Sequence, residues 1–288
     1  MLHGLTKALV SRSRGSHRAA VGLAASVITL VAAAAVSLVG VSPASANSHA
    51  GPHLLKIDKG VSPMLAGNLI NHGGPVQTAP VVYVVFWGWV SDPSGEQPYL
   101  TNFLSSVGGT SWLSSVNQYG SSSNSRLGGT WSDTASVPTR PTDSQIQAEA
   151  SKASTHFGTG TSLNVQIVVA TPTGHSTSGF GTQWCAYHGA VSSRPNITYT
   201  DLPYMTDAGS SCGKGSVNSP GTLDGVSIVE GHELAEAITD PLLNAWYDAS
   251  GQENGDKCAW TRLHNITTSR GTFAVQPLWS NAANGCVG

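Results

Sequence analysis

The amino-acid sequence predicts a fold of the α+β (or α/β) class, with a mixed β-sheet, one buried helix and disulfide crosslinks. Segments patterned like strands alternate along the chain with segments patterned like helices. The stretch 226–240 is apolar on nearly every side if it is drawn as a helix, which indicates a buried position. The four cysteines form an even set, as in a disulfide framework.

The composition excludes several classes of protein. Of the 288 residues, 40% are hydrophobic, which is ordinary for a folded chain, but only 10% are charged. A nucleic-acid-binding protein needs a basic face to neutralise phosphates, and the 14 Lys and Arg residues do not supply one. No repeat with a period of roughly 20–50 residues is visible, so solenoids are excluded as well.

The first 46 residues have the pattern of a secretory signal peptide. A basic region containing Lys7 precedes an acid-free apolar run over 19–41, and the small residues Ala44-Ser45-Ala46 follow it. We expect cleavage after Ala46, which makes the mature protein secreted (extracellular) and leaves it without a membrane segment. A retained anchor is the alternative, because the apolar run is long enough to span a bilayer.

Cleavage there removes 46 of 288 residues and leaves 242, with 10 basic and 16 acidic side chains, because all charges of the leader are basic. Residues 47–69 are polar and lack a period, so they are predicted to form a flexible N-terminal arm. No linker divides the rest of the chain, and 70–288 is predicted to be a single domain.

The first half of that domain contains four predicted segments. Residues 81–87 are a continuous run of β-branched and aromatic side chains, typical of a buried central strand. Apolar spacing predicts one or two helices over 98–119, and the Ser/Gly-rich stretch 121–129 is expected to be a loop. A helix is predicted over 143–157, between a proline and a glycine.

The second half contains three predicted strands and one helix. Alternating valine and isoleucine residues predict a strand over 163–170, and further strands are expected over 196–204 and 272–279. The Gly/Ser-rich stretch 205–221 is expected to be a loop. A helix is predicted over 226–240, where the following proline ends it.

The four cysteines, Cys185, Cys212, Cys258 and Cys286, can pair in three ways. Pairing in chain order closes two loops of similar size, and this is the pairing we expect in an exported protein. A cysteine-rich metal site is the alternative, but the sequence has no Cys-x-x-Cys spacing to support it.

The stretch that carries chemistry is Gly231-His232-Glu233-Leu234-Ala235-Glu236. His232 and Glu236 are four residues apart, so on a helix they share one face. Proteins with a His-Glu-x-x-His helix hold zinc with this spacing, and their intervening glutamate is the general base. Here Glu236 stands at the second ligand position, and Glu233 is the candidate catalytic base.

A third ligand must come from another segment. Glu253 and Asp256 are the best candidates, with Asp240, one turn beyond Glu236, as the alternative. Eight of the 16 acidic residues lie between Asp224 and Asp256, a stretch without Lys or Arg, and such a cluster is either a solvated face or a cation site. Zn²⁺ is the expected ion, and the anionic ligands also suit Mn²⁺ or Ca²⁺.

Alternative interpretations exist for these signals. The helix could lie on the surface with solvated His and Glu side chains, but its apolar surroundings favour burial, where polar groups need partners. His188, three residues after Cys185, is interpreted as a structural histidine, with a place in the lining of the site as the alternative. Tryptophans could stack on cell-wall glycan, although Trp is more often a half-buried core residue. They are Trp87, Trp89, Trp184, Trp246, Trp260 and Trp279.

Further segments accompany the helix motif: Asn71-His72-Gly73-Gly74-Pro75-Val76, Trp184-Cys185-Ala186-Tyr187-His188, Asp240-Pro241, Asn244-Ala245-Trp246-Tyr247, Gly255-Asp256-Lys257-Cys258, and Val275-Gln276-Pro277-Leu278-Trp279-Ser280 with Cys286. With them the chain resembles the EXORDIUM / phosphate-induced protein 1 family over roughly residues 70–288. The resemblance implies an extracellular or wall-associated protein, and the plant members are linked to growth and cell expansion. A wider set of secreted bacterial proteins with the same motifs looks zincin-like, and the leader of this chain suits that group.

Two functional hypotheses follow. The first is a secreted metal-dependent hydrolase, with extracellular polypeptide as the favoured substrate. In it His232, Glu236 and either Asp256 or Glu253 bind the ion, and Glu233 moves protons. The second is a non-catalytic extracellular or cell-wall-associated protein of the EXORDIUM type, whose helix carries a structural cation site. Glu236, in place of a second histidine, is the departure from true zincins.

Overall fold

The computed structural model describes residues 53–56, 67–194 and 196–288. The signal peptide predicted over 1–46 and most of the arm predicted over 47–69 lie outside the described residues. Within the part of the chain that is described, no helix is long and apolar enough to cross a membrane.

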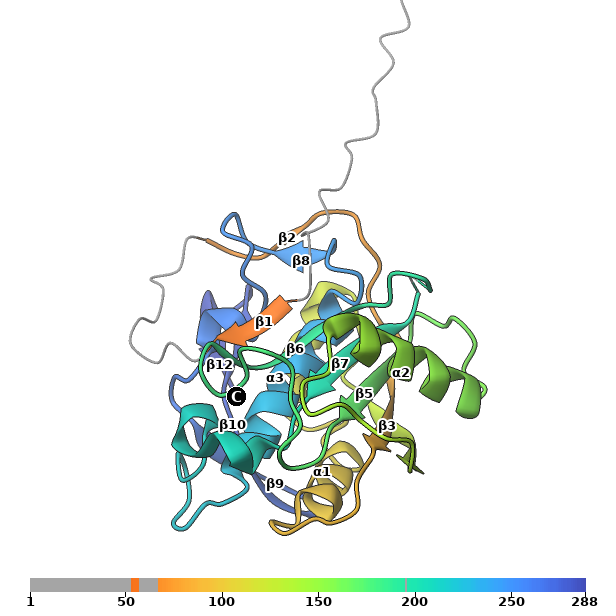
Figure 1. The fold of residues 1–288 in the computed structure, drawn as a ribbon. Coiled ribbons are helices and arrows are strands. Elements are labelled where there is room, and N and C mark those ends of the chain that lie inside the picture. The colour runs from red at the N-terminus through yellow and green to blue at the C-terminus, as the bar shows by residue number, and fades with distance from the viewer. Residues whose placement is uncertain (1–52, 57–66, 195) are drawn as a thin grey trace, which may run out of the picture. The chain divides into compact units, whose positions relative to one another are not determined.

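A mixed six-stranded β-sheet in the order β1-β6-β7-β5-β3-β4 organises the fold (Figure 1). Strands β7, β5, β3 and β4 are parallel to one another, whereas β6 is antiparallel to β7 and β1 is antiparallel to β6. The mixed sheet of an α+β protein is therefore confirmed. The strands are β1 (His53–Lys56), β3 (Val81–Trp87), β4 (Arg126–Asp133), β5 (Val165–Ala170), β6 (Trp184–Ala190) and β7 (Thr198–Leu202).

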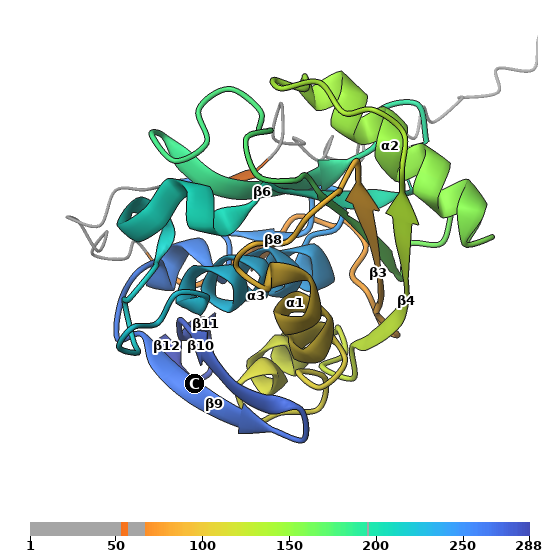
Figure 2. The ribbon, with the colours of Figure 1, turned by 60° about the horizontal axis from the view of Figure 1, so that its bottom comes forward.

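Helices cover both faces of this sheet, which explains why the central strands are apolar throughout. Helix α2 (Asp143–His156) packs on one face, while α1 (Glu96–Leu104) and α3 (Asp224–Thr239) lie on the other (Figure 2). Helix α2 begins with a capping box, in which the side chains of Thr142 and Gln145 each accept from the other's backbone N–H. The helix predicted over 143–157 is therefore confirmed.

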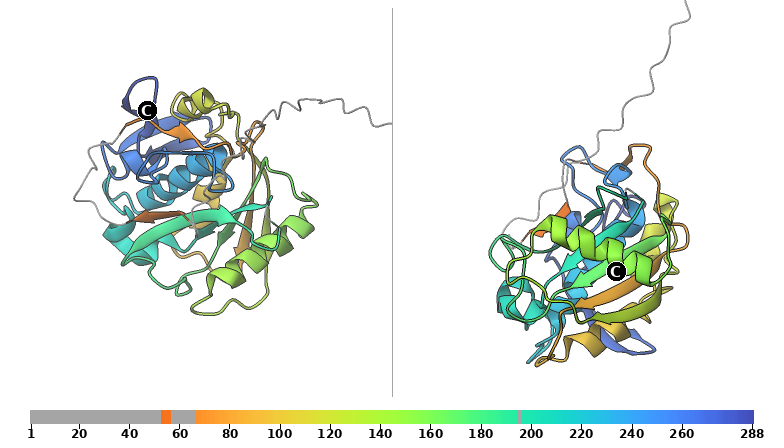
Figure 3. Two further views of the ribbon diagram at one scale, coloured as in Figure 1. Left: turned by 90° about the horizontal axis from the view of Figure 1, so that it is seen from above. Right: turned by 45° about the vertical axis from the view of Figure 1, so that its right-hand side comes forward.

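All residues of helix α3 are buried. It packs against β6 on one side and against β10 (Gly271–Val275) on the other (Figure 3). Ser227 anchors the second contact, since its hydroxyl donates to the carbonyl of Ala274 at 2.7 Å. This position confirms the predicted buried helix.

Short elements complete the chain. Three two-stranded ladders pair β2 with β8, β9 with β10 and β11 with β12. They and the 3-10 helices have these bounds: β2 (Ile70–Asn71), β8 (Trp246–Tyr247), β9 (His264–Thr268), β11 (Leu278–Ser280), β12 (Gly285–Val287), η1 (Leu113–Tyr119), η2 (Met205–Cys212) and η3 (Asp256–Cys258).

Several segments differ from the expectation, among them 205–221, which was expected to be a loop but contains η2 (Met205–Cys212). The stretch 121–129 is not a loop throughout, because β4 starts at Arg126 and pairs with β3 along the sheet edge. Its glycines weaken the strand pattern, yet Gly128 is needed where the backbone passes Tyr83, since a Cβ there would lie 2.5 Å from the tyrosine ring. Strand β6 was also not predicted, and it carries His188.

Both expected disulfide bonds are present. Cys185 in β6 is bonded to Cys212 at the end of η2, and Cys258 in η3 is bonded to Cys286 in β12. The first bond joins two elements that both contact α3, β6 and η2. Three of the six tryptophans considered for glycan stacking are buried core residues: Trp87, Trp184 and Trp279.

Candidate metal centre

The ends of α3 decide where its polar side chains lie. At the start, the Asp224 carboxylate accepts hydrogen bonds from the backbone N–H groups of Val217 and Asn218, which holds the preceding loop. At the end, Asp240 leaves the helical conformation, with φ −145° and ψ 59°, because the ring of Pro241 disfavours an α conformation before it. Between these ends His232, Glu233 and Glu236 point into the protein.

A first group of ligand atoms comes from His232, Glu236 and Asp256. His232 Nε2 lies 3.0 Å from Glu236 Oε1 and 3.7 Å from Asp256 Oδ1. Two ligands bound about 2.1 Å from a tetrahedral ion lie about 3.4 Å apart, so these spacings suit a shared ion. The structure thus brings His232 and Glu236 together with Asp256, one of the two best candidates for the third ligand.

The Asp256 loop packs tightly against α3. The backbone N–H of Asp256 donates to Glu236 Oε1 at 2.9 Å, and the side-chain amide of Asn254 donates to the carbonyl of Ala235 at 3.0 Å. Gly255 is required by this close approach, because a Cβ there would lie 2.7 Å from His232 Nδ1. The loop therefore cannot carry a larger side chain at 255 without moving the histidine.

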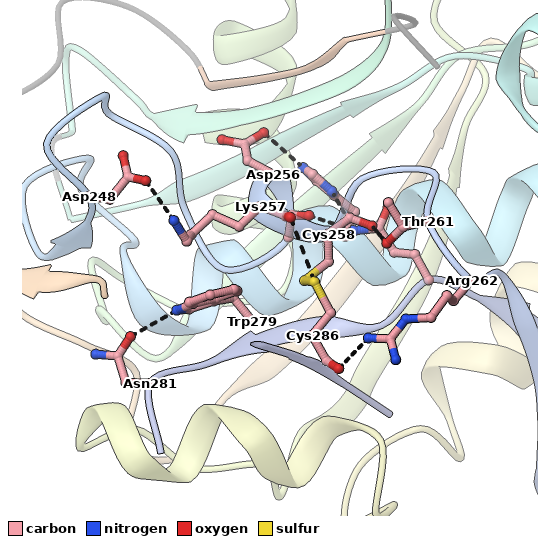
Figure 4. The surroundings of a disulfide bond; sticks show 12 residues. Asp248, Asp256, Lys257, Cys258, Thr261, Arg262, Trp279, Asn281 and Cys286 are labelled. Atoms are coloured by element: carbon pink, nitrogen blue, oxygen red, sulfur yellow. Dashed lines mark hydrogen bonds and ion pairs between the residues drawn. A yellow bond between two sulfur atoms is a disulfide. The ribbon is translucent and has the colours of Figure 1, made fainter. Parts of the chain in front are cut away.

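Further contacts hold the loop in place (Figure 4). Lys257 Nζ donates to Asp248 at 2.7 Å and lies 4.5 Å from the ring centre of Trp279. The Cys258–Cys286 bond follows directly, and the Arg262 guanidinium donates to the carbonyl of Cys286. These contacts hold Asp256 at its distance from His232.

A second group of ligand atoms surrounds His188 on β6. Its Nδ1 lies 3.2 Å from Glu233 Oε2 and 3.5 Å from Glu236 Oε2. Its Nε2 lies 3.5 Å from Glu253 Oε2, so Glu253 faces His188. Sequence reasoning did not include His188 among the ligands, and only its position shortly after Cys185 in a patterned segment pointed to it.

Burial is nearly complete at this centre. The side chains of His188, His232, Glu233, Glu236 and Glu253 have no exposed surface, and that of Asp256 is 15% exposed. A surface cavity of about 330 Å³ lies on the α2 side of β6, and none of these six residues lines it.

Burial and crowding disfavour ionised carboxylates here. Burial raises the pKa of Glu233 well above its usual value, and the nearby charges of Glu236, Glu230 and Asp256 raise it further. Burial, followed by the charge of Glu236, also raises the pKa of Glu253. The pKa of Glu230, one turn before Glu233, is raised by burial alone.

Asp240, the alternative ligand, has a structural role. Its Oδ1 accepts from the backbone N–H groups of Asn244 and Ala245 at 2.6 and 2.7 Å, which shapes the turn after α3. The remaining donor set, imidazole nitrogens and carboxylate oxygens, is the set that binds Zn²⁺ or Mn²⁺. Glu233 Oε1 has no hydrogen-bond partner in the described structure, as expected of a buried oxygen in an ion site.

No protein-family model, no curated protein and no solved structure matches this chain.

Proposed function

We propose that the protein is a secreted metal-dependent hydrolase whose ion is held by His232, Glu236 and Asp256. The observation that carries the proposal is the convergence of these three side chains, from a helix and a separate loop, at ligand spacing. Glu233, the candidate base, lies on the same helix. Zn²⁺ is the proposed ion, and Mn²⁺ suits the carboxylates equally.

The residues have complementary tasks in such a reaction. The ion would supply Lewis-acid polarisation of the carbonyl that is attacked. Glu233 Oε1 is positioned to accept a proton, because no other group engages it in the described structure, while its Oε2 faces His188 at 3.2 Å. Burial raises the pKa of Glu233, which favours its protonated form, and the positive charge of a bound ion would offset this and restore the carboxylate that accepts the proton.

The proposed substrate is extracellular polypeptide. The support is the similarity of the sequence motifs to secreted zincin-like proteins, together with the two disulfide bonds, which suit an oxidising compartment. A zincin-like arrangement, with the ligand-bearing helix packed on the sheet, is part of this proposal.

A second candidate is a non-catalytic extracellular or cell-wall-associated protein of the EXORDIUM type, with a structural cation site. The enclosure of the centre favours it, because structural metal sites are closed whereas catalytic sites keep an open position. Only Asp256 has an exposed fraction above zero among the six residues of the centre. In this candidate the ion fixes α3 to the Asp256 loop and to β6.

The test compares wild type with His232→Ala and Glu233→Gln, using metal analysis and hydrolysis of a denatured protein substrate. His232→Ala should lower the metal content by one ion per chain and abolish hydrolysis. Glu233→Gln should keep that ion and lose about 10²–10⁴-fold in rate, the usual worth of general-base assistance.

Glu230→Gln is the matched control, because Glu230 is equally buried on α3 but belongs to neither ligand group. It should leave the metal content unchanged and change the rate far less than Glu233→Gln does, because Glu230 acts on Glu233 only through its charge. Stoichiometric metal without hydrolysis in the wild type would reject the hydrolase and support the structural site. Wild-type protein without stoichiometric metal would reject both candidates.

A further inference from the structure

We infer that the centre binds a second divalent cation through His188, Glu233 and Glu236, so that Glu236 bridges two ions. The inference rests on the proposed cation centre and extends it from one ion to two. It adds strand β6 to the site, because β6 carries His188. It also makes Glu233 Oε2 a ligand of the second ion, while Oε1 remains the proposed proton acceptor.

The orientation of Glu236 carries the inference. Its Oε1 lies 3.0 Å from His232 Nε2, and its Oε2 lies 3.5 Å from His188 Nδ1. One carboxylate therefore presents each of its two oxygens to a different histidine. A carboxylate shared in this way is the usual bridge in two-ion hydrolytic sites, where the ions are about 3.5–4 Å apart.

The second group satisfies the same geometry as the first. His188 Nδ1 lies 3.2 Å from Glu233 Oε2 and 3.5 Å from Glu236 Oε2, close to the spacing of about 3.4 Å between ligands of a tetrahedral ion. The ligand atoms of His188, Glu233 and Glu236 all lie within 4.8 Å of one another.

His188 has a carboxylate near the nitrogen that faces away from its ion, because its Nε2 lies 3.5 Å from Glu253 Oε2. Metal-binding histidines are normally oriented by such outer contacts. Glu253 thereby acquires a defined place, as the carboxylate that orients His188.

The charge of the centre points the same way. Four buried or nearly buried carboxylates converge on two histidines, and the stretch 224–256 contains no Lys or Arg. In the ionised form that binds metal, the four carboxylates carry four negative charges, of which one divalent ion offsets two. Glu233 supports a bound cation independently of this charge, because its side chain is fully buried and its Oε1 has no hydrogen-bond partner within the described residues. The four carboxylates belong to Glu233, Glu236, Glu253 and Asp256.

The experiment strips the mature protein with a chelator, reloads it with Mn²⁺, removes excess ion and counts the bound metal. We expect two ions per wild-type chain, one in His188→Ala, one in His232→Ala and none in Glu236→Ala. Two control variants should retain two ions: Glu230→Gln in the same helix, and His156→Ala, whose exposed ring stacks on Trp131.

Electron paramagnetic resonance of the wild type gives a readout that needs no variant. Two Mn²⁺ ions bridged by Glu236 should show a spin-coupled signal, whereas a single bound ion shows the signal of an isolated ion. An isolated signal with one ion per wild-type chain overturns the second site. If that ion survives in His188→Ala and is lost in His232→Ala, the proposed function stands. Absence of bound Mn²⁺ from the wild type overturns both.

Discussion

Glu233→Gln should stabilise the metal-free protein and destabilise the metal-loaded protein relative to wild type. Without an ion, the Glu233 carboxylate is buried beside Glu236, and both face the same nitrogen of His188. Glutamine keeps the shape and can still accept the His188 hydrogen bond, but it removes one negative charge. With ions bound, the same charge becomes favourable, so its loss weakens the site.

The magnitude follows from the spacing of the two carboxylates. Ligand oxygens of Glu233 and Glu236 lie within 4.8 Å of each other, and two unit charges at that distance repel by about 3.5 kcal/mol at an effective dielectric constant of about 20. This value sets the scale of the gain in stability. For a domain of this size it corresponds to a rise in melting temperature of about 7–14 °C.

The gain should grow with pH. Because the folded-state pKa of Glu233 is raised, the folded wild type retains a proton that the unfolded chain releases above pH 4.5. Wild-type stability is therefore lost as pH rises above that value, whereas the glutamine variant has no such proton to lose. The two proteins should converge in acid and differ most in weak alkali.

The assay is thermal unfolding in chelator and in excess Mn²⁺, at several pH values. An ion at about 100 times its dissociation constant stabilises the folded state by about 2.7 kcal/mol. Wild type should therefore have the lower melting temperature in chelator and the higher melting temperature in excess Mn²⁺, compared with Glu233→Gln. Glu230→Gln, the control, should also gain stability in chelator but should not reverse. A Glu233→Gln variant that is less stable than wild type in chelator at pH 8 would refute the argument.

Two further predictions concern stability. Replacing Cys258 and Cys286 by serine removes a bond that spans 28 residues; this should lower the free energy of unfolding by about 3.5 kcal/mol and weaken ion binding, because the loop carries Asp256. Urea unfolding and Mn²⁺ titration measure both effects, and unchanged ion affinity would contradict the coupling. Burial raises the pKa of Asp201, on β7, to about 7, so the folded state holds a proton that the unfolded chain releases above about pH 4. This proton makes the stability of wild type fall by up to about 1.4 kcal/mol per pH unit between about pH 4 and 7, and Asp201→Asn should remove that part of the fall. A variant whose stability changes with pH as that of wild type does would disprove this.

The sequence alone determined the features that depend on neighbours along the chain. The apolar run of β3, the helix α2 between a proline and a glycine, and the buried character of α3 are local patterns, and each is present in the structure. The pairing of His232 with Glu236 is local as well, because residues four apart on a helix always share a face. Similar loop lengths were sufficient to indicate the two disulfide bonds.

The tertiary structure decided which distant segments meet. Glu253 and Asp256 belong to one loop with similar chemistry, and only its packing on α3 places Asp256 at His232 and Glu253 at His188. His188 lies 45 residues before Glu233, and no local period connects a strand residue to a helix so far along the chain. Its role depends on β6 being the strand that packs against α3, which is set by sheet order and long-range packing rather than by local sequence.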